Sequence, residues 1–210
     1  ILNNIFGFIK NGQKTFIKMI HLSNNKESID KAVTLLKNGE VIIYPTDTLY
    51  GFGVDATNSK AIEKINSLKN RKDPLSIIVS SLSEIETYGK LDKYSKQICK
   101  KIFPGPFTIL IESINSNLSP LVNESSQYTG IRIPNHSFSI EVVKQLGKPI
   151  ITTSVNKKGS PSLKKISDMQ KIFPNIDIFQ AKINLSSKGS TIINLAHNPY
   201  KIIRHGDGTL

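Results

Sequence analysis

Short apolar runs and helical patterns alternate along most of the chain. The runs are rich in Ile, Val, Leu and Phe and contain little polar alternation, which is typical of strands buried on both faces. They lie at residues 41–44, 75–79, 107–111, 129–133 and 149–153, with three later ones at residues 176–179, 190–195 and 200–204.

Between these runs, apolar residues recur every three or four positions, as on one face of an amphipathic helix. Ile29, Val33 and Leu36 show this spacing, and the pattern stops at Gly39; Gly147 ends a similar pattern later in the chain. Side chains that cap helix N-termini precede these patterns. The starts are expected at Asn25 or Ser28, at Asn58 or Ser59, at Asp92 and at Ser137, with a last helix near residues 167–173.

Strands that alternate with helices predict an α/β fold with a mixed sheet and helices on both of its faces. Residues 1–18 lack a clear period and precede Met19, so we expect an extension of unknown role, natural or left by cloning, before one domain at residues 19–210. No apolar run approaches the roughly 20 residues of a membrane span, so we expect no membrane partner.

The charge of the chain allows two interpretations. The net charge is +12, from 28 basic and 16 acidic residues. It either attracts an anion such as a nucleotide or nucleic acid, or reflects Lys spread evenly through the chain. The composition within the basic residues is more specific, because only Arg71, Arg132 and Arg204 are Arg. The planar donor fork of Arg suits carboxylate and phosphate, so these three residues are candidates for an anion site.

Several kinds of catalytic and metal-binding site are excluded because the chain lacks the residues that they require. A single cysteine, Cys99, allows neither an internal disulfide nor an all-cysteine metal site, and its apolar neighbours predict a buried side chain. The four His residues show no metal-ligand spacing, so no metal site is predicted. There is no phosphate-loop Lys motif and no nucleophile-elbow Ser.

Hydroxyls, amides and the three Arg residues gather where predicted strands begin or end. Ligands of α/β proteins bind at such strand ends. The segments are PTDTLYGFG (45–53), SLKNRKDPLS (67–76), PGPFT (104–108), TGIRIP (129–134), TTSVNKKGSPS (152–162), GSTII (189–193) and IIRHGDG (202–208).

In their order and content, these segments resemble the motifs of the YrdC family of threonylcarbamoyl-AMP synthases, from about Met19 to Gly208. The resemblance implies a twisted mixed sheet of about seven strands around a basic cavity. It also implies a nucleotidyltransferase that joins L-threonine, bicarbonate or CO2, and ATP into threonylcarbamoyl-adenylate and pyrophosphate. Mg²⁺ would accompany ATP, and other tRNA-modification proteins would pass the group to an adenosine in tRNA, in the cytoplasm. Direct contact with tRNA is left open.

The resemblance also assigns residues to the two substrates. L-threonine would be held by Thr48, Arg132, Thr152 and Ser190, with Arg132 as the fork for its carboxylate. ATP would be held by Lys69, Arg71, Tyr128, Ser154, Asn156, Ser162 and Arg204, with Lys69 and Arg71 as the catalytic pair.

Two other functions remain open. One is an RNA-binding module of the same fold without turnover, although base-stacking aromatic residues are sparse, at 7% with no Trp. The other is a carbamoyl-adenylate enzyme of a related maturation system. Those relatives carry acylphosphatase and zinc-finger segments, which do not fit in 210 residues with one Cys.

Overall fold

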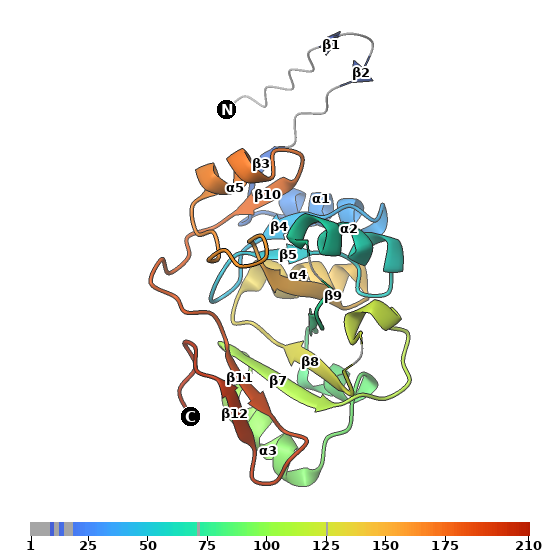
Figure 1. The fold of residues 1–210 in the computed structure, drawn as a ribbon, viewed down its shortest axis with the longest axis vertical. Helices are drawn as coiled ribbons and strands as arrows, with labels where there is room; N and C mark the ends of the chain where they lie inside the picture. Colours follow the sequence, from blue (N-terminus) through green and yellow to red (C-terminus); the bar gives the residue numbers. More distant parts are fainter. Residues whose placement is uncertain (1–8, 11–12, 15–18, 71, 125) are drawn as a thin grey trace.

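A mixed sheet runs through the whole molecule and carries the helices on its two faces (Figure 1). The computed structural model describes residues 9–10, 13–14, 19–70, 72–124 and 126–210. Within them the sheet has ten strands in the order β12-β11-β7-β8-β6-β9-β5-β4-β10-β3. The strands are β3 (Ile20–Leu22), β4 (Ile42–Tyr44), β5 (Gly51–Gly53), β6 (Ser76–Ile78), β7 (Phe107–Glu112), β8 (Tyr128–Arg132), β9 (Ile150–Ser154), β10 (Asp177–Gln180), β11 (Thr191–Asn194) and β12 (Lys201–Arg204).

Five α-helices and two 3-10 helices are found in the same part of the chain. They are α1 (Lys26–Lys37), α2 (Ser59–Lys69), η1 (Leu82–Thr87), α3 (Lys93–Ile102), η2 (Pro120–Val122), α4 (Ser137–Leu146) and α5 (Ile166–Ile172). Near the N-terminus, β1 (Ile9–Lys10) and β2 (Gln13–Lys14) pair antiparallel with each other, apart from the main sheet.

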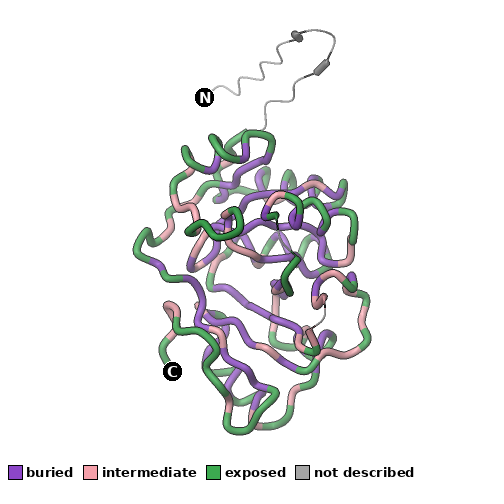
Figure 2. Tube along the Cα trace, viewed as in Figure 1, coloured by how far each residue is buried: buried purple, intermediate pink, exposed green. Residues whose placement is uncertain are grey.

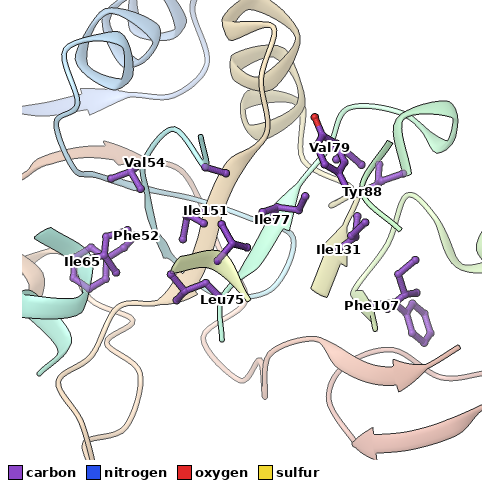
Figure 3. Packing of buried hydrophobic residues seen from close by; sticks show 14 of the residues in the cluster. Phe52, Val54, Ile65, Leu75, Ile77, Val79, Tyr88, Phe107, Ile131 and Ile151 are labelled. Carbon is purple, nitrogen blue, oxygen red and sulfur yellow. The ribbon is translucent and has the colours of Figure 1, made fainter. Parts of the chain in front are cut away.

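The central strands are apolar throughout because both of their faces are covered. Successive side chains of a strand point to opposite faces. Thus Ile43 packs into the larger core cluster with α2, α3 and α5, whereas its neighbour Ile42 packs into a second cluster with α1 and α4. Ile77 and Ile78 divide in the same way. Figure 3 shows part of the larger cluster around Phe52, Ile77 and Ile151, and Figure 2 shows buried strands under helices whose outer sides are exposed.

The predicted helix boundaries are confirmed where a local signal sets them. Asn25 caps α1, and its side chain accepts a hydrogen bond from Ser28 N at 2.8 Å. Asp92 caps α3 by accepting from Ser95 N at 2.7 Å. Gly147 ends α4 with a φ of 70°, in the left-handed region that favours glycine.

The α/β class is confirmed, but the expected count of about seven strands was wrong. Two of the ten strands, β3 and β5, were not predicted from the sequence. β5 has the sequence GFG, and glycine weakens strand propensity. Tertiary packing explains its composition: a Cβ atom on Gly53 would lie 2.7 Å from Cε1 of Tyr44 on the neighbouring strand β4.

Candidate functional site

The turn between β4 and β5 is held by its own hydroxyl groups. Thr46 Oγ1 accepts a hydrogen bond from Thr48 N at 3.1 Å and donates to Leu49 O at 2.7 Å. Ser139 of α4 donates to Pro45 O at 2.7 Å and attaches the turn to the helix layer. The Thr-rich segment therefore forms a rigid turn at the end of a central strand.

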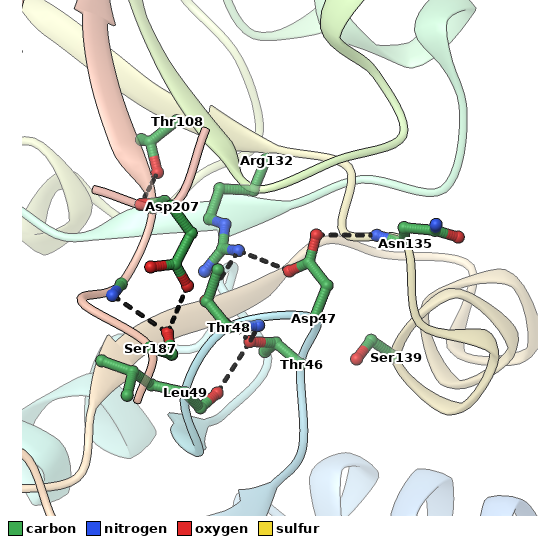
Figure 4. A network of polar contacts seen from close by, with 12 residues as sticks. Thr46, Asp47, Thr48, Leu49, Thr108, Arg132, Asn135, Ser139, Ser187 and Asp207 are labelled. Atoms are coloured by element: carbon green, nitrogen blue, oxygen red, sulfur yellow. Dashed lines mark hydrogen bonds and ion pairs between the residues drawn. The ribbon is translucent and has the colours of Figure 1, made fainter. Parts of the chain in front are cut away.

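Arg132, at the end of β8, points at this turn and is buried with 7% of its surface exposed. Its Nη2 donates to Asp47 Oδ1 at 2.7 Å and to Thr48 Oγ1 at 3.1 Å, while Asp47 Oδ2 accepts from Asn135 N at 3.0 Å (Figure 4). A buried guanidinium needs such a partner, because an unpaired charge in the interior is strongly unfavourable. We call Thr46, Asp47, Thr48 and Arg132 the Arg132 wall.

A second wall is built from the segment before β11 and the end of the chain. The guanidinium of Arg204 donates from Nε and Nη2 to Ser190 O, at 3.2 and 2.8 Å, and from Nη2 to Ser190 Oγ at 3.1 Å. Asp207 accepts from Ser187 Oγ (Figure 4), and it also accepts from Lys188 N at 2.8 Å. Gly206 lies so close that a Cβ there would sit 2.2 Å from Gly189 O. We call residues 187–190 and 204–207 the Arg204 wall.

Residues of both walls, together with residues of β6, β9 and the segments beside them, line a cavity of about 300 Å³. All four residues predicted to bind L-threonine line it, together with some of those predicted to bind ATP. These residues are Thr48, Arg132, Thr152, Ser190, Ser154, Ser162 and Arg204. They come from segments far apart in the chain, so the structure brings the scattered motifs into one site.

Lys69 lies behind the cavity rather than in its lining. It is 1% exposed, and its Nζ donates to the carbonyls of Ser154 and Asn156 and, at 2.7 Å, to Asn156 Oδ1. Ser154 Oγ also donates to Asn156 Oδ1 at 2.7 Å. In this arrangement Lys69 holds the loop after β9 in place, and Asn156 takes part in that support.

Among the residues that the structure describes, Tyr128 is also not part of the cavity lining. Tyr128 begins β8, whereas Arg132 ends it, and the Tyr128 hydroxyl accepts a hydrogen bond from Gln127. Arg71 lies outside the described residues. The assignment of Arg71 to ATP and catalysis stays a prediction.

The sequence did not single out several residues that the structure places in the site. Asp47 and Thr108 stand inside recognised motifs, PTDT and PGPFT, but neither had been assigned a role. Lys188 and Leu49 also line the cavity; Leu49 stands inside PTDTLYGFG without an assigned role, and Lys188 directly precedes GSTII. Thr108 is the most notable of these, because its Oγ1 lies 2.7 Å from Ser190 Oγ and both residues are buried.

The electrostatics of the cavity favour an anion. Arg132, Arg204 and Lys188 line it, and none of its described lining residues is acidic. Partial burial and, after it, the charge of Arg132 lower the pKa of Arg204, as expected for two cations facing one space. Burial also lowers the pKa of His136, and the nearby Asp47 carboxylate opposes that shift.

Cys99 is not among the residues that line this cavity, and its thiol is buried. It is buried in α3, and burial raises the pKa of its thiol to about 12. The thiolate required of a nucleophile is therefore not formed near neutral pH. Among the described residues there is also no group of three or more His, Cys, Asp or Glu side chains able to hold a metal ion.

Comparison with known proteins agrees with the motifs. The family model Sua5/YciO/YrdC, described as "Telomere recombination", matches residues 34–206. A protein of Methanocaldococcus jannaschii is 34% identical over 194 residues, which cover 87% of this chain and 89% of that protein. The threonylcarbamoyl-AMP synthase of Bacillus subtilis is 33% identical over 144 residues, covering 67% of this chain and 42% of that enzyme. The chain thus matches less than half of that relative's length.

A solved structure confirms the fold. The crystal structure of P. abyssi Sua5 complexed with L-threonine superposes with a TM-score of 0.82 at 23% identity, covering 90% of this chain and 57% of that one. In the part of this chain that the structure describes, no helix is long and apolar enough to cross a membrane.

Proposed function

The chain belongs to the Sua5/YciO/YrdC family, and we propose that it is a threonylcarbamoyl-AMP synthase. In this reaction L-threonine, bicarbonate or CO2, and ATP give threonylcarbamoyl-adenylate and pyrophosphate. One observation carries the proposal: the four residues expected to hold threonine, from four separate segments, line a single cationic cavity.

The chemistry requires positioning rather than a protein nucleophile. The amine of threonine and CO2 form a carbamate, and a carbamate oxygen attacks the α-phosphorus of ATP. A new oxygen–phosphorus bond forms while the bond to the β-phosphate bridging oxygen breaks, and pyrophosphate leaves with that electron pair. The protein can accelerate this step by aligning the reactants and neutralising their charge. Burial, which raises the pKa of the Cys99 thiol, is consistent with such a mechanism.

The walls suggest how the reactants divide the cavity. Arg132 and the hydroxyls around it suit the amino acid, and we place ATP at the side of Ser154, Ser162 and Arg204. Lys69 supports that side through the loop after β9, and we assign Arg71 to the polyphosphate. Mg²⁺ would arrive on the phosphates of ATP as part of the substrate, since none of the described lining residues offers a carboxylate to hold it.

The product would serve the threonylcarbamoyl modification of adenosine in tRNA, with other tRNA-modification proteins taking up the adenylate in the cytoplasm. The test is pyrophosphate release from ATP, with L-threonine and bicarbonate omitted in turn, and identification of the adenylate by mass. Release should require both additions. Binding of RNA with a steep salt dependence and no release of pyrophosphate would contradict the proposal and favour an RNA-binding module.

A further inference from the structure

The hydroxyl groups on the two sides of the cavity differ in what they can offer a ligand. A hydroxyl has one proton to donate and two lone pairs to accept with. The hydrogen bonds that the hydroxyls on each side already make therefore determine whether that side presents a free proton or a free lone pair to the ligand.

On the Arg132 wall the hydroxyl protons are already used. Thr46 donates its proton to Leu49 O at 2.7 Å. The contact of 3.1 Å between Thr46 Oγ1 and Thr48 Oγ1 therefore requires Thr48 to be the donor. Thr48 also accepts from Arg132 Nη2, so what it has left for a ligand is a lone pair. This position suits an amine or hydroxyl hydrogen of the ligand.

On the side of the cavity formed by Ser190 and Thr108, one hydroxyl proton remains available for a ligand. Ser190 Oγ accepts from Arg204 Nη2 at 3.1 Å and shares a hydrogen bond of 2.7 Å with Thr108 Oγ1. Arg204 can only donate. Two hydroxyl protons are therefore available for one bond between Ser190 and Thr108, and no described residue accepts the second.

The charge of Arg204 decides which hydroxyl keeps this proton. A hydroxyl that accepts from a guanidinium becomes a stronger donor and a weaker acceptor, because hydrogen bonds in a chain polarise one another. Ser190 then donates to Thr108, and Thr108 holds the free proton. Thr108 is 3% exposed and lines the cavity, so a ligand atom that enters the cavity is the acceptor within reach.

The guanidinium of Arg132 indicates which kind of ligand group would be that acceptor. Both protons of Nη2 are engaged, by Asp47 and by Thr48, and Nε is buried without a partner. The fork therefore has only Nη1 ready for a new anion unless Asp47 or Thr48 moves. A carboxylate bound through Nη1 needs a second donor for its other oxygen.

We propose that Thr108 is a further substrate-contacting residue, whose hydroxyl donates a hydrogen bond to the carboxylate of the amino-acid substrate. The inference rests on the proposed function and adds an orientation to it. The carboxylate lies between Arg132 and Thr108, and the amine lies toward Thr48, where a lone pair is available.

The test is calorimetric titration of the full chain with L-threonine and with L-2-aminobutyrate, which lacks the β-hydroxyl but keeps the carboxylate. The variants are Thr108→Val, which removes the donor at nearly constant shape, and Thr108→Ser, which keeps it. Thr129→Val is the matched control, because Thr129 is also buried, bonds Ser113 Oγ at 2.8 Å and does not line the cavity. Thermal unfolding of each variant confirms that it is folded.

We expect Thr108→Val to bind L-threonine about tenfold more weakly or worse, as for a lost hydrogen bond to a charged group. The same factor should appear with L-2-aminobutyrate. Thr108→Ser should keep most of the affinity, and Thr129→Val should bind as the wild type does.

Three results overturn the inference while leaving the proposed function intact: wild-type affinity in Thr108→Val, equal losses in the Val and Ser variants, or a loss that disappears with L-2-aminobutyrate. The last would mean that Thr108 contacts the β-hydroxyl instead. A folded wild-type protein that binds no L-threonine would overturn the proposed function, and the inference with it.

Discussion

The Arg132 wall is buried and its charge is neutralised by Asp47, whereas the Arg204 wall joins the buried residues Ser187 and Ser190 to an exposed segment near the C-terminus. Arg132 has a carboxylate partner, Asp47, at 2.7 Å, and both side chains are less than a tenth exposed. Arg204 instead donates to the carbonyl and hydroxyl of Ser190, and its guanidinium is partly buried although the residue as a whole is exposed.

Because of this difference, we expect mutations in the two walls to have different effects. Burial makes the geometry of the Arg132 wall part of the core, so a change there should alter folding as well as binding. The Arg204 wall depends on a few hydrogen bonds between residues 187–190 and 204–207. A change there should mainly alter the local order of one side of the cavity.

The largest effect is expected from Asp47→Ala. It leaves the Arg132 guanidinium buried without its counter-charge, which should lower the free energy of unfolding by about 3–5 kcal/mol. Urea denaturation measures this. Glu141→Ala is the control, since the pair of Glu141 with Lys144 is half-exposed and should contribute at most about 1 kcal/mol. Equal losses in the two variants would show that the Arg132 wall is not a buried ion-pair network.

Next in size is Arg132→Lys. A single ammonium cannot serve Asp47, Thr48 and a ligand carboxylate with the planar geometry of the fork. The affinity for L-threonine, measured by calorimetry without nucleotide, should fall by about tenfold or more, roughly 1.4 kcal/mol.

The companion variant Arg204→Lys should lose less threonine affinity, because Arg204 donates to Ser190 and not to a carboxylate. If Arg204→Lys lost more threonine affinity than Arg132→Lys, the assignment of the amino acid to the Arg132 wall and of ATP to the side of Arg204 would be wrong.

A smaller effect is expected from Asp207→Ala, which removes the acceptor of the hydrogen bonds from Ser187 Oγ and Lys188 N. The loss of stability should be about 1 kcal/mol. Amide hydrogen exchange should become faster in residues 187–190 and stay unchanged in residues 46–48. Faster exchange in both segments would mean that the two walls form one cooperative unit.

The smallest effect concerns pH and His136. Burial holds the pKa of this side chain below its usual 6.5, although Asp47 opposes the shift. As the pH falls below about 6.5, the unfolded chain takes up a proton that the folded chain does not, so stability decreases. Above that pH the contribution is fully present. Urea unfolding over a pH series should show a shallower decrease for His136→Asn, and an unchanged slope would contradict this view of His136.

Local signals determined much of this fold. The caps at Asn25, Asn58 and Asp92 and the stop at Gly147 act within a few residues of the helix ends they define, and so they can be read directly from the sequence. The apolar strands predicted helices on both faces of the sheet, because apolar side chains at successive positions of a strand point to opposite faces and both faces must then be covered. The motifs, taken in order, indicated the family and nearly all of the cavity.

Only the tertiary structure decided how those pieces meet. β5 is a strand in spite of its two glycines because it pairs with β4 and β9 on either side, and Tyr44 of β4 fills the space where a side chain on Gly53 would lie. Asp47 and Arg132 are 85 residues apart in sequence, and Thr108 and Ser190 are 82 apart. Neither residue of such a pair carries a local signal for its partner. Strand order and register bring them within hydrogen-bond distance, and that contact determines which groups remain free for a substrate.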